Sequence, residues 1–464
     1  MRIEHDFLGE REIPDSAYYG VQTLRGKENF HITGIPISHA RSFITAFGFV
    51  KKAAAMANKD LDVLEPLVAD ASCAACDRLI AGELHDQFIV DVIQGGAGTS
   101  TNMNANEVIA NKALELLGHP KGTYDIVHPN NHVNCSQSTN DAYPTAFRLS
   151  LYIEIGQLIE QLGLLRDAFA RKGVEFADVL KMGRTQLQDA VPMTLGQEFE
   201  SFAVNIGEDI RRLEEARLLV TEVNLGATAI GTSINAPEGY PALSVKHLRE
   251  VSGIPVTLSQ NLIEATWDNG AYVQVSGVLK RVAVKLSKIC NDLRLLSSGP
   301  RCGFNEINLP RLQPGSSIMP GKVNPVIPEV VNQVCYLVIG NDVTVTFAAE
   351  AGQLQLNVME PVLAYCLFQS IEVLTRACAT LRERCVDGIT ANPEHTHAMV
   401  MNSVGIVTAL NPILGYEQSA AIAKEAFETG GSVIDIVRSK GLLSEEKLAE
   451  IFSAENLMHP RFIR

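Results

Sequence analysis

Apolar residues spaced three and four positions apart dominate the chain from about residue 139 onward. This spacing places them on one face of an α-helix, so it predicts a long amphipathic helix over 146–176 and a second over 194–223. The apolar stripes of the two helices comprise Phe147, Leu151, Ile155, Leu158, Leu162 and Leu165, and Phe199, Phe202, Ile206, Ile210 and Leu213.

Two further segments, 261–296 and 328–384, contain few glycines and are apolar on more than one face. A helix that is apolar nearly all round belongs inside a larger assembly. Helices of this length exceed the usual size of roughly 11–12 residues, and they normally bury themselves in a bundle or against other subunits. We therefore expect a mainly α fold with a central bundle of long helices, in an oligomer.

The sequence on either side of these long segments has a different pattern of apolar and polar residues. A chain of 464 residues suggests about three domains at roughly 150 residues each. We predict a mixed, mostly helical N-terminal domain over 1–137 and a long-helix domain over 138–392. A small helical domain over 393–464 follows, because Asn392-Pro393 precedes shorter helical stretches and several turns.

The charge balance restricts the ligands that the chain can bind. Lys and Arg number 39 against 53 Asp and Glu, which gives a formal net charge of −14. Nucleic acid is not an expected partner, because phosphate contacts need a clustered basic face and the sequence contains none. An anionic substrate would need a site that is locally positive or rich in N–H and O–H donors.

The N-terminus and the cysteines predict a cytoplasmic location. Residues 1–6 are charged and contain no apolar run, so they are typical of neither a signal peptide nor a transit sequence. We find no stretch near the roughly 18–20 uncharged apolar residues of a membrane span, and we expect no membrane partner. The nine cysteines lack the density of a disulfide scaffold and are interpreted as reduced thiols.

The segment 314–325 carries the most unusual chemistry in the sequence. It reads Pro-Gly-Ser-Ser-Ile-Met-Pro-Gly-Lys-Val-Asn-Pro, so two glycines and three prolines bracket two hydroxyls, a lysine and an asparagine. Glycine allows tight backbone geometry and proline excludes regular helix, which indicates a shaped loop. It is not a phosphate-binding Walker A loop, because five residues separate its glycines and Val323 follows the lysine.

Four other segments, 95–104, 128–141, 182–189 and 224–231, are rich in small hydroxyls and amides. Such groups are neutral donors that suit carboxylate oxygens. Within the second segment, His128 and His132 fit either hydrogen bonding at a helix end or an auxiliary anion site.

These segments resemble the aspartase/fumarase superfamily, whose signature is closely matched by Gly315 to Asn324. The similarity extends from Glu4 to about Pro460. The other matching motifs are Ala17 to Thr23, Gly98 to Asn102, Gln137 to Asp141, Gly183 to Thr185, Asn224 to Thr232 and Ala409 to Pro412. Within the superfamily, the run from Thr185 to Met193 is similar to that of the members that release ammonia from L-aspartate.

The resemblance implies a three-domain helical subunit, a homotetramer, and active sites assembled from three subunits. It also implies a lyase that converts L-aspartate to fumarate and ammonia. No cofactor is implied as a requirement. A divalent cation such as Mg²⁺ remains a candidate activator, although no carboxylate cluster in the sequence marks a chemically required site.

The matched positions also imply roles for individual residues. Ser316 is the base that removes a proton from Cβ, with Lys322 nearby, and the hydroxyls of Thr99, Ser138, Thr139 and Ser317 surround the β-carboxylate. The α-carboxylate is held by Lys322, Asn324, Thr185 and Gln186. Asn140, together with Thr99, contacts the amino group.

Gln186 also separates the competing interpretations. Class II fumarases that resemble this chain carry His at this position, as do some members that act on aspartate, so Gln186 argues against hydration of fumarate. A helical scaffold without activity is the other alternative. That alternative is disfavoured because Ser316, Ser317, Lys322 and Asn324 occur together.

Overall fold

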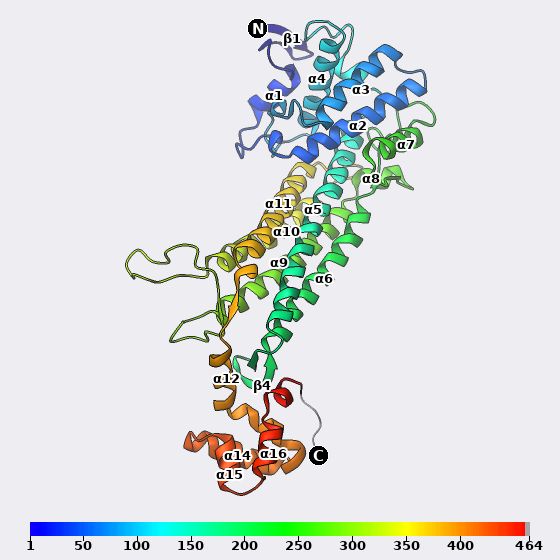
Figure 1. The fold of residues 1–464 in the computed structure, drawn as a ribbon. Coiled ribbons are helices and arrows are strands. Elements are labelled where there is room, and N and C mark those ends of the chain that lie inside the picture. Colours follow the sequence, from blue (N-terminus) through cyan, green and yellow to red (C-terminus); the bar gives the residue numbers. More distant parts are fainter. Residues whose placement is uncertain (460–464) are drawn as a thin grey trace. The chain divides into compact units, whose positions relative to one another are not determined.

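The structure, a computed structural model, describes residues 1–459 and is mainly α-helical, which confirms the predicted fold class (Figure 1). The α-helices are α1 (Val21–Asn29), α2 (Arg41–Asp60), α3 (Pro66–Ile80), α4 (Thr99–Leu116), α5 (Thr139–Glu175), α6 (Leu195–Leu219), α7 (Tyr240–Ser252), α8 (Leu262–Trp267), α9 (Gly270–Leu296), α10 (Val326–Glu350), α11 (Glu360–Arg384), α12 (Pro393–Asn402), α13 (Asn411–Leu414), α14 (Tyr416–Thr429), α15 (Val433–Ser439), α16 (Glu445–Ile451) and α17 (Ala454–Met458).

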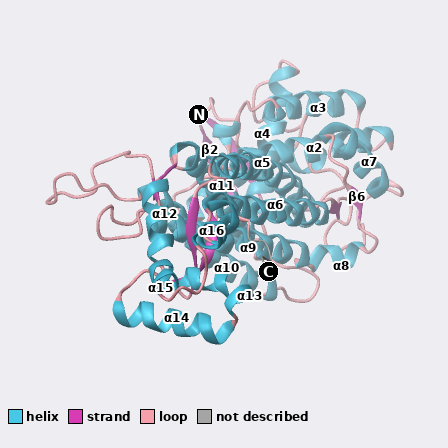
Figure 2. Cartoon of the chain, turned by 60° about the horizontal axis from the view of Figure 1, so that its bottom comes forward, coloured by secondary structure: helices cyan, strands magenta, loops and turns pink. Residues whose placement is uncertain are grey.

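The strands are short and form four separate pairs, which Figure 2 shows in magenta. Three pairs are antiparallel and one, β5 with β6, is parallel. The strands are β1 (Arg2–Asp6), β2 (Gly9–Ile13), β3 (Leu180–Thr185), β4 (Gln188–Thr194), β5 (Glu222–Val223), β6 (Thr257–Leu258), β7 (Ile307–Asn308) and β8 (Thr390–Ala391).

The two helices predicted over 146–176 and 194–223 are confirmed as α5 and α6. The segments 261–296 and 328–384, in contrast, are each broken into two helices. Asp268 ends α8, and its carboxylate accepts the backbone N–H of Gly270 at the start of α9. Asn357 donates to the carbonyl oxygens of Ala348 and Ala349 in the last turn of α10. Polar side chains that bond to backbone groups at helix ends therefore mark where these segments break. The apolar pattern does not reveal these positions.

The chain divides into two compact units, each made of three stretches of sequence. The first comprises residues 1–159, 211–283 and 336–374, and the second comprises 160–210, 284–335 and 375–464. Helices α5, α6, α9, α10 and α11 each contribute residues to both units. The domain boundaries at 137/138 and 392/393 stay a prediction.

The first unit has an aromatic core. The ring of Phe147 on α5 stacks on Tyr272 of α9, with 4.4 Å between centroids, and meets Phe368 of α11 edge-on at 5.3 Å. Phe43 of α2 packs edge-on against Tyr143, one turn before Phe147, at 5.1 Å. Such offset and edge contacts add about 0.5–1.5 kcal/mol each to the burial of the rings. They join α2 to three helices of the bundle.

The second unit contains two apolar cores. Phe169 of α5 and Phe176, directly after this helix, pack with Phe199 and Phe202 of α6, at centroid distances of 5.3 to 6.0 Å. A C-terminal core is built from α12 to α17, and Leu180 and Met182 of β3 join it. The hairpin formed by β3 and β4 is thus anchored by one face of its first strand.

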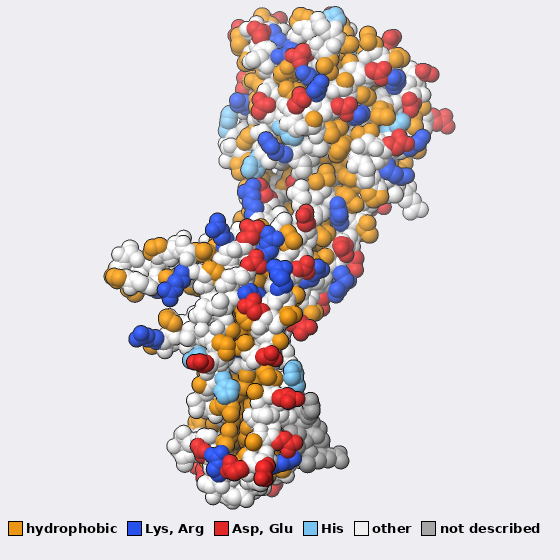
Figure 3. Space-filling view, viewed as in Figure 1, with side chains coloured by type: hydrophobic (Ala, Val, Ile, Leu, Met, Phe, Trp, Pro, Cys, Tyr) orange, Lys and Arg blue, Asp and Glu red, His pale blue; other side chains and the backbone are white. Residues whose placement is uncertain are grey.

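Two bundle helices have large apolar surfaces. By length and composition alone, Val326–Glu350 and Glu360–Gly388 could each cross a membrane. Neither contains 18–20 uncharged residues in a row, because α10 contains Asp342, which binds Ser276 and Lys280 of α9, and α11 contains Glu372. Hydrophobic side chains lie on the surface of the bundle helices (Figure 3). On α10 they include Val330, Tyr336, Leu337, Val343 and Phe347.

Candidate active site

A pocket of about 400 Å³ lies in the first unit where two helices begin. Thr99 opens α4 and Thr139 opens α5, and both residues line the pocket. The N-terminus of a helix carries free N–H groups and a partial positive charge, so it favours an anion. The complete lining is Gln22, Thr99, Asn102, Met103, Asn130, Asn134, Ser136, Gln137, Ser138, Thr139, Thr228, Ala229, Ile234 and Asn235. No acidic side chain belongs to this lining.

The predicted residues of the first unit hold defined positions around this pocket. The Thr99 hydroxyl donates to the Gly96 carbonyl at 2.8 Å, and the Ser138 hydroxyl accepts the N–H of Asn140 at 3.2 Å. The Thr139 hydroxyl accepts a hydrogen bond from the Asn102 amide at 3.1 Å. The Asn140 amide nitrogen donates to the Ala229 carbonyl at 2.8 Å, so its amide oxygen is the atom suited to accept from a cationic group.

A buried lysine beneath the pocket was not predicted from the sequence. Lys51 of α2 is 1% exposed, and its ammonium donates to side-chain oxygens of Asn102 at 2.6 Å and of Asn134 and Gln137 at 3.0 Å. The three ammonium protons thus have three amide oxygens as acceptors, and the residues that carry these amides line the pocket. Burial lowers the pKa of Lys51 to about 7. Lys51 therefore fixes the orientation of the amides, and in its protonated form it places a positive charge below an anion site.

Asp141 ties the start of α5 to the loop between β5 and α7. Its carboxylate accepts backbone N–H groups of Ser138 at 3.0 Å, Gly226 at 3.1 Å and Thr228 at 2.8 Å. Burial raises the pKa of Asp141 to about 6, against the effect of these hydrogen bonds and of the Lys51 charge. The segment 224–231 is therefore held in place on one side of the pocket.

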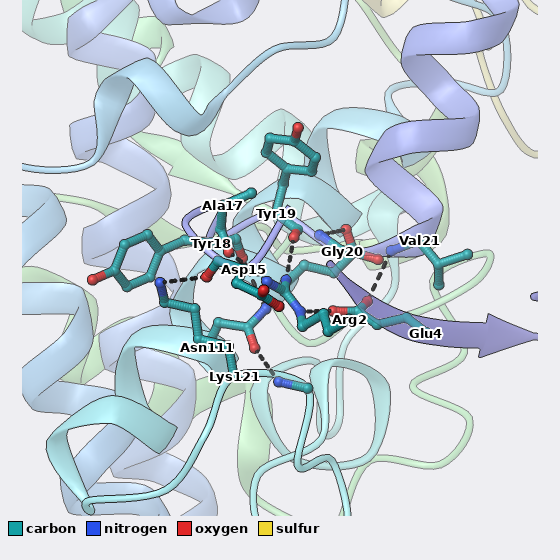
Figure 4. Close-up of polar contacts among 12 residues, drawn as sticks. Arg2, Glu4, Asp15, Ala17, Tyr18, Tyr19, Gly20, Val21, Asn111 and Lys121 are labelled. Atoms are coloured by element: carbon teal, nitrogen blue, oxygen red, sulfur yellow. Dashed lines mark hydrogen bonds and ion pairs between the residues drawn. The ribbon is translucent and has the colours of Figure 1, made fainter. Parts of the chain in front are cut away.

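The N-terminal motif from Ala17 to Thr23 is held by two buried carboxylates. Glu4 pairs with Arg2 at 2.7 Å and accepts the N–H of Val21 at 3.0 Å, as Figure 4 shows. Glu107 of α4 accepts the backbone N–H groups of Gly20, Gln22 and Thr23 at 2.8 to 3.1 Å. Burial raises the pKa of Glu107 to about 7. These contacts position Gln22, whose amide reaches Asn130 across the rim of the pocket at 3.3 Å.

The two histidines of the polar run form hydrogen bonds at a helix end, which was one of the two interpretations. His132 Nδ1 accepts the N–H of His128 at 2.9 Å, and His128 Nδ1 accepts that of Asn130 at 3.0 Å. Both bonds use a ring nitrogen without a proton. Burial lowers the pKa of each histidine, which favours the neutral ring.

The signature loop lies in the second unit, between β7 and α10. Its neck is closed where the Gly315 N–H donates to the Lys322 carbonyl and the Asn324 amide donates to the Gly315 carbonyl, both at 2.7 Å. Ser317 and Lys322 are exposed. Figure 1 shows the chain between α9 and α10 projecting from the helices as two loops.

The Ser316 hydroxyl has an unusual environment for so exposed a loop. Its oxygen accepts the backbone N–H of Met319 at 2.9 Å and that of Ile318 at 3.2 Å. Two backbone donors that point at one hydroxyl oxygen would stabilise a negative charge on it. The loop thus supplies the oxyanion partners that a serine base requires.

Thr185 and Gln186 lie at the tip of the β3–β4 hairpin in the second unit. Thr185 pairs with Gln188, so Gln186 and Leu187 form a two-residue turn in which both have positive φ, 54° and 62°. Such turns normally use Asn-Gly, because a left-handed conformation costs other residues about 1–2 kcal/mol each. Strain of this kind at an exposed tip is typical of functional positions.

The predicted site residues therefore fall into two groups. The first unit holds Thr99, Ser138, Thr139 and Asn140, and the second holds Thr185, Gln186, Ser316, Ser317, Lys322 and Asn324. Within residues 1–459, no three His, Cys, Asp or Glu side chains form a group that could hold a metal ion. The nine cysteines are free thiols in the described part of the chain.

The chain matches the family model described as Lyase over residues 9–340 and the model described as Fumarase C C-terminus over 406–459. It is thus a member of the lyase family, and within it of the aspartase/fumarase superfamily. A relative named aspartate ammonia-lyase, from Helicobacter pylori, is 62% identical over 460 residues, which cover 99% of this chain and 98% of that protein.

Two solved structures are also similar. The structure described as fumarate lyase:delta crystallin from Brucella melitensis is 56% identical, with a TM-score of 0.97 and coverage of 99% of this chain and 100% of that one. A class II fumarase from Schistosoma mansoni is 33% identical, with a TM-score of 0.93 and coverage of 99% of both chains.

Proposed function

We propose that this chain catalyses the reversible deamination of L-aspartate to fumarate and ammonia, with Ser316 as the general base. The observation that supports Ser316 as the base is the pair of backbone N–H groups on its hydroxyl oxygen. The choice of aspartate is supported by 62% identity to an aspartate ammonia-lyase, against 33% to a class II fumarase, over nearly the whole chain.

The reaction begins with removal of a proton from Cβ of aspartate, next to a carboxylate that is already anionic. The electron pair moves onto that carboxylate and gives a dianionic aci-carboxylate. The Cα–N bond then breaks, the double bond of fumarate forms, and the amino group leaves as ammonia. Stabilising the second negative charge with fixed donors is the largest catalytic requirement.

The pocket of the first unit has the properties needed to stabilise that charge. The hydroxyls of Thr99, Ser138 and Thr139 lie at the starts of α4 and α5, and the Lys51 ammonium lies behind them. We assign these three hydroxyls, with that of Ser317, to the β-carboxylate. Asn140, whose amide nitrogen is already occupied, offers its oxygen to the substrate ammonium, together with Thr99.

The loop and the hairpin of the second unit supply the other contacts. Lys322 and Asn324 of the loop, with Thr185 and Gln186 at the hairpin tip, would hold the α-carboxylate. A lysine at this position also favours ionisation of the Ser316 hydroxyl. Closure of the exposed loop over the substrate would exclude water and strengthen these charge interactions.

Replacement of Lys322 by Met tests the carboxylate role. We expect Lys322→Met to raise KM for aspartate and to lower kcat, because it removes a charge from both the ground state and the transition state. The loss in kcat/KM should be about 10²-fold, the value for one strong charge-assisted hydrogen bond of about 3 kcal/mol. Steady-state kinetics with aspartate measure both constants, and an unchanged KM would contradict the assignment.

The overall reaction is tested by ultraviolet absorbance of fumarate. Absorbance that rises with L-aspartate but not with L-malate supports the ammonia-lyase. Absorbance that rises with L-malate alone would identify a fumarase, which Gln186 disfavours. No change with either substrate would support an inactive scaffold.

We infer further that the protein is a cytoplasmic homotetramer whose active sites combine residues of three subunits. The resemblance to the aspartase/fumarase superfamily supports shared sites. The apolar surface of α10, where Phe347 is 69% exposed, is suited to packing against other subunits.

Shared sites predict complementation between inactive variants. If different subunits supply Thr139 and Ser316 to one site, a tetramer assembled from Thr139→Ala and Ser316→Ala would contain some sites that carry neither substitution. We expect activity to reappear when the two inactive proteins are unfolded, mixed and refolded together. Each variant refolded alone is the control. Failure of the mixture to regain activity, with a tetramer seen by light scattering, would contradict shared sites.

The proposed chemistry requires no cofactor, because Ser316 takes the proton and the surrounding donors stabilise the charge. Mg²⁺ or another divalent cation would act as an activator only. Activity measured before and after treatment with a chelator tests this point.

A further inference from the structure

A buried ionic cluster lies in the second unit, beside both of its candidate site segments. The carboxylate of Glu306 contacts the Arg184 guanidinium at 2.5 Å and the Lys181 ammonium at 2.8 Å. The three side chains are 1%, 11% and 3% exposed, respectively. Lys181 also binds Glu198 of α6 at 2.5 Å. Removing one partner of such a buried group costs much more than removing a surface ion pair.

A β-bulge lies beside the two cations. Leu180 and Met182 join the C-terminal core, whereas Lys181 and Arg184 both contact Glu306. The register of the hairpin shifts by one residue between Met182 and Arg184, so that Ala190 and Val191 of β4 lie opposite Gly183. Gly183 permits this close approach, since a Cβ there would lie 2.9 Å from the Val191 carbonyl oxygen.

Glu306 itself belongs to the root of the Ser316 loop. Its N–H donates to the Leu296 carbonyl at the end of α9, and its carbonyl accepts the N–H of Asn392. The next residue, Ile307, pairs with Ala391 in the β7–β8 ladder. The Arg184 guanidinium also lies over the ring of Phe304, 4.3 Å from the ring centroid. Arg184 thus contacts the loop root at two points.

Apart from this cluster, few contacts hold the candidate site residues of the hairpin and the loop in position. Thr185 and Gln186, directly after Arg184, are exposed at the hairpin tip, and most of the loop from 311 to 323 is exposed. Their positions therefore depend on how their bases are fixed. The hairpin base is held to the C-terminal core by Leu180 and Met182, and to the loop root by Arg184.

We propose that Glu306 is a positioning residue that joins the hairpin carrying Thr185 and Gln186 to the root of the loop carrying Ser316. It acts through the Arg184 guanidinium, whose two contacts hold β3 against segment 304–306. The inference deepens the proposed function and rests on it for its kinetic readout.

The test compares Glu306→Gln with Glu198→Gln. Both substitutions remove a carboxylate from Lys181, but only Glu306 also contacts Arg184 and the loop root. We expect Glu306→Gln to lower kcat/KM for aspartate by about tenfold or more, chiefly through KM, since the hairpin tip holds the α-carboxylate. Glu198→Gln should stay within about threefold of the unmodified protein.

Hydrogen exchange supplies a readout that does not depend on activity. Glu306→Gln should speed exchange of backbone amides in both 180–190 and 304–325, whereas Glu198→Gln should leave 304–325 unchanged. Arg184→Gln should reproduce the effects of Glu306→Gln, and the double variant should be little worse than either. If Glu306→Gln does not fold, Arg184→Gln makes the same comparison, because it leaves Glu306 paired with Lys181.

Equal effects of Glu306→Gln and Glu198→Gln, or unchanged exchange in 304–325, would overturn the proposal. Additive losses in the double variant would also overturn it, because they would show that Glu306 does not act through Arg184. Absence of aspartate turnover in the unmodified protein would refute the proposed function alone, since exchange would still test the link.

Discussion

Ser316→Ala is expected to abolish turnover of aspartate while leaving binding of fumarate largely intact. The substitution removes the only atom that is proposed to accept the Cβ proton, and it leaves the carboxylate contacts in place. A positioned general base contributes about 10²- to 10⁴-fold, so kcat should fall at least into this range. Steady-state kinetics measure the loss, and calorimetric titration with fumarate measures the retained binding.

The neighbouring hydroxyl provides a matched control. Ser317→Ala removes the same group one position further along the loop, where the proposed role is to bind the β-carboxylate. It should therefore weaken fumarate binding and leave measurable turnover. Full activity in Ser316→Ala, or a larger loss of kcat in Ser317→Ala, would assign the base elsewhere.

The hydrogen bonds of the half-buried Ser316 support its proposed role as a base. A hydroxyl is normally too weak an acid to ionise, but the Ser316 oxygen already accepts two backbone N–H groups. These donors are fixed by the backbone, so they need no reorganisation when charge develops. The sequence indicates a shaped loop from its glycines and prolines, but not which N–H groups face the hydroxyl.

The long helices illustrate which parts of the fold the sequence predicts. Helical spacing of apolar residues identified α5 and α6, because a single buried stripe runs along each. The segments 261–296 and 328–384 are apolar on several faces, so no single stripe along them indicates where each helix begins and ends. Their breaks depend on Asp268 and Asn357, whose side chains satisfy backbone groups at helix ends. Polar residues used in this way are invisible to an analysis of apolar spacing.

The site shows a similar division. Local runs of hydroxyls and amides indicated donor-rich segments at 95–104 and 128–141, and the structure places Thr99 and Thr139 of these segments at the starts of α4 and α5. Lys51 was missed because its role depends on α2 packing against α4 and the segment 134–137, which are distant in sequence. Asp141 was inside a recognised polar run, but its partners Gly226 and Thr228 come from a remote loop.

Gly315→Ala is expected to lower kcat/KM by about 10²-fold or more without changing thermal stability. A Cβ at this position would lie 2.8 Å from the Asn324 backbone nitrogen and 2.9 Å from the Lys322 carbonyl oxygen. The two sides of the loop neck, at Gly315 and at Lys322 to Asn324, would have to separate. This movement would displace Ser316 and Lys322 together. A misplacement of about 1 Å at reacting groups can cost 10²-fold in rate. The loop is exposed, so its distortion should not affect the core.

Gly321→Asn in the same loop separates this effect from general loop damage. Gly321 has φ of +82°, a left-handed conformation that Asn tolerates, and a Cβ there would meet no atom within 4 Å. This variant should keep most of the activity. Kinetics and thermal unfolding of both variants test the argument. Equal losses in the two would show that the loop needs flexibility rather than the closed neck at Gly315, and a lowered melting temperature in Gly315→Ala would show that the neck also stabilises the fold.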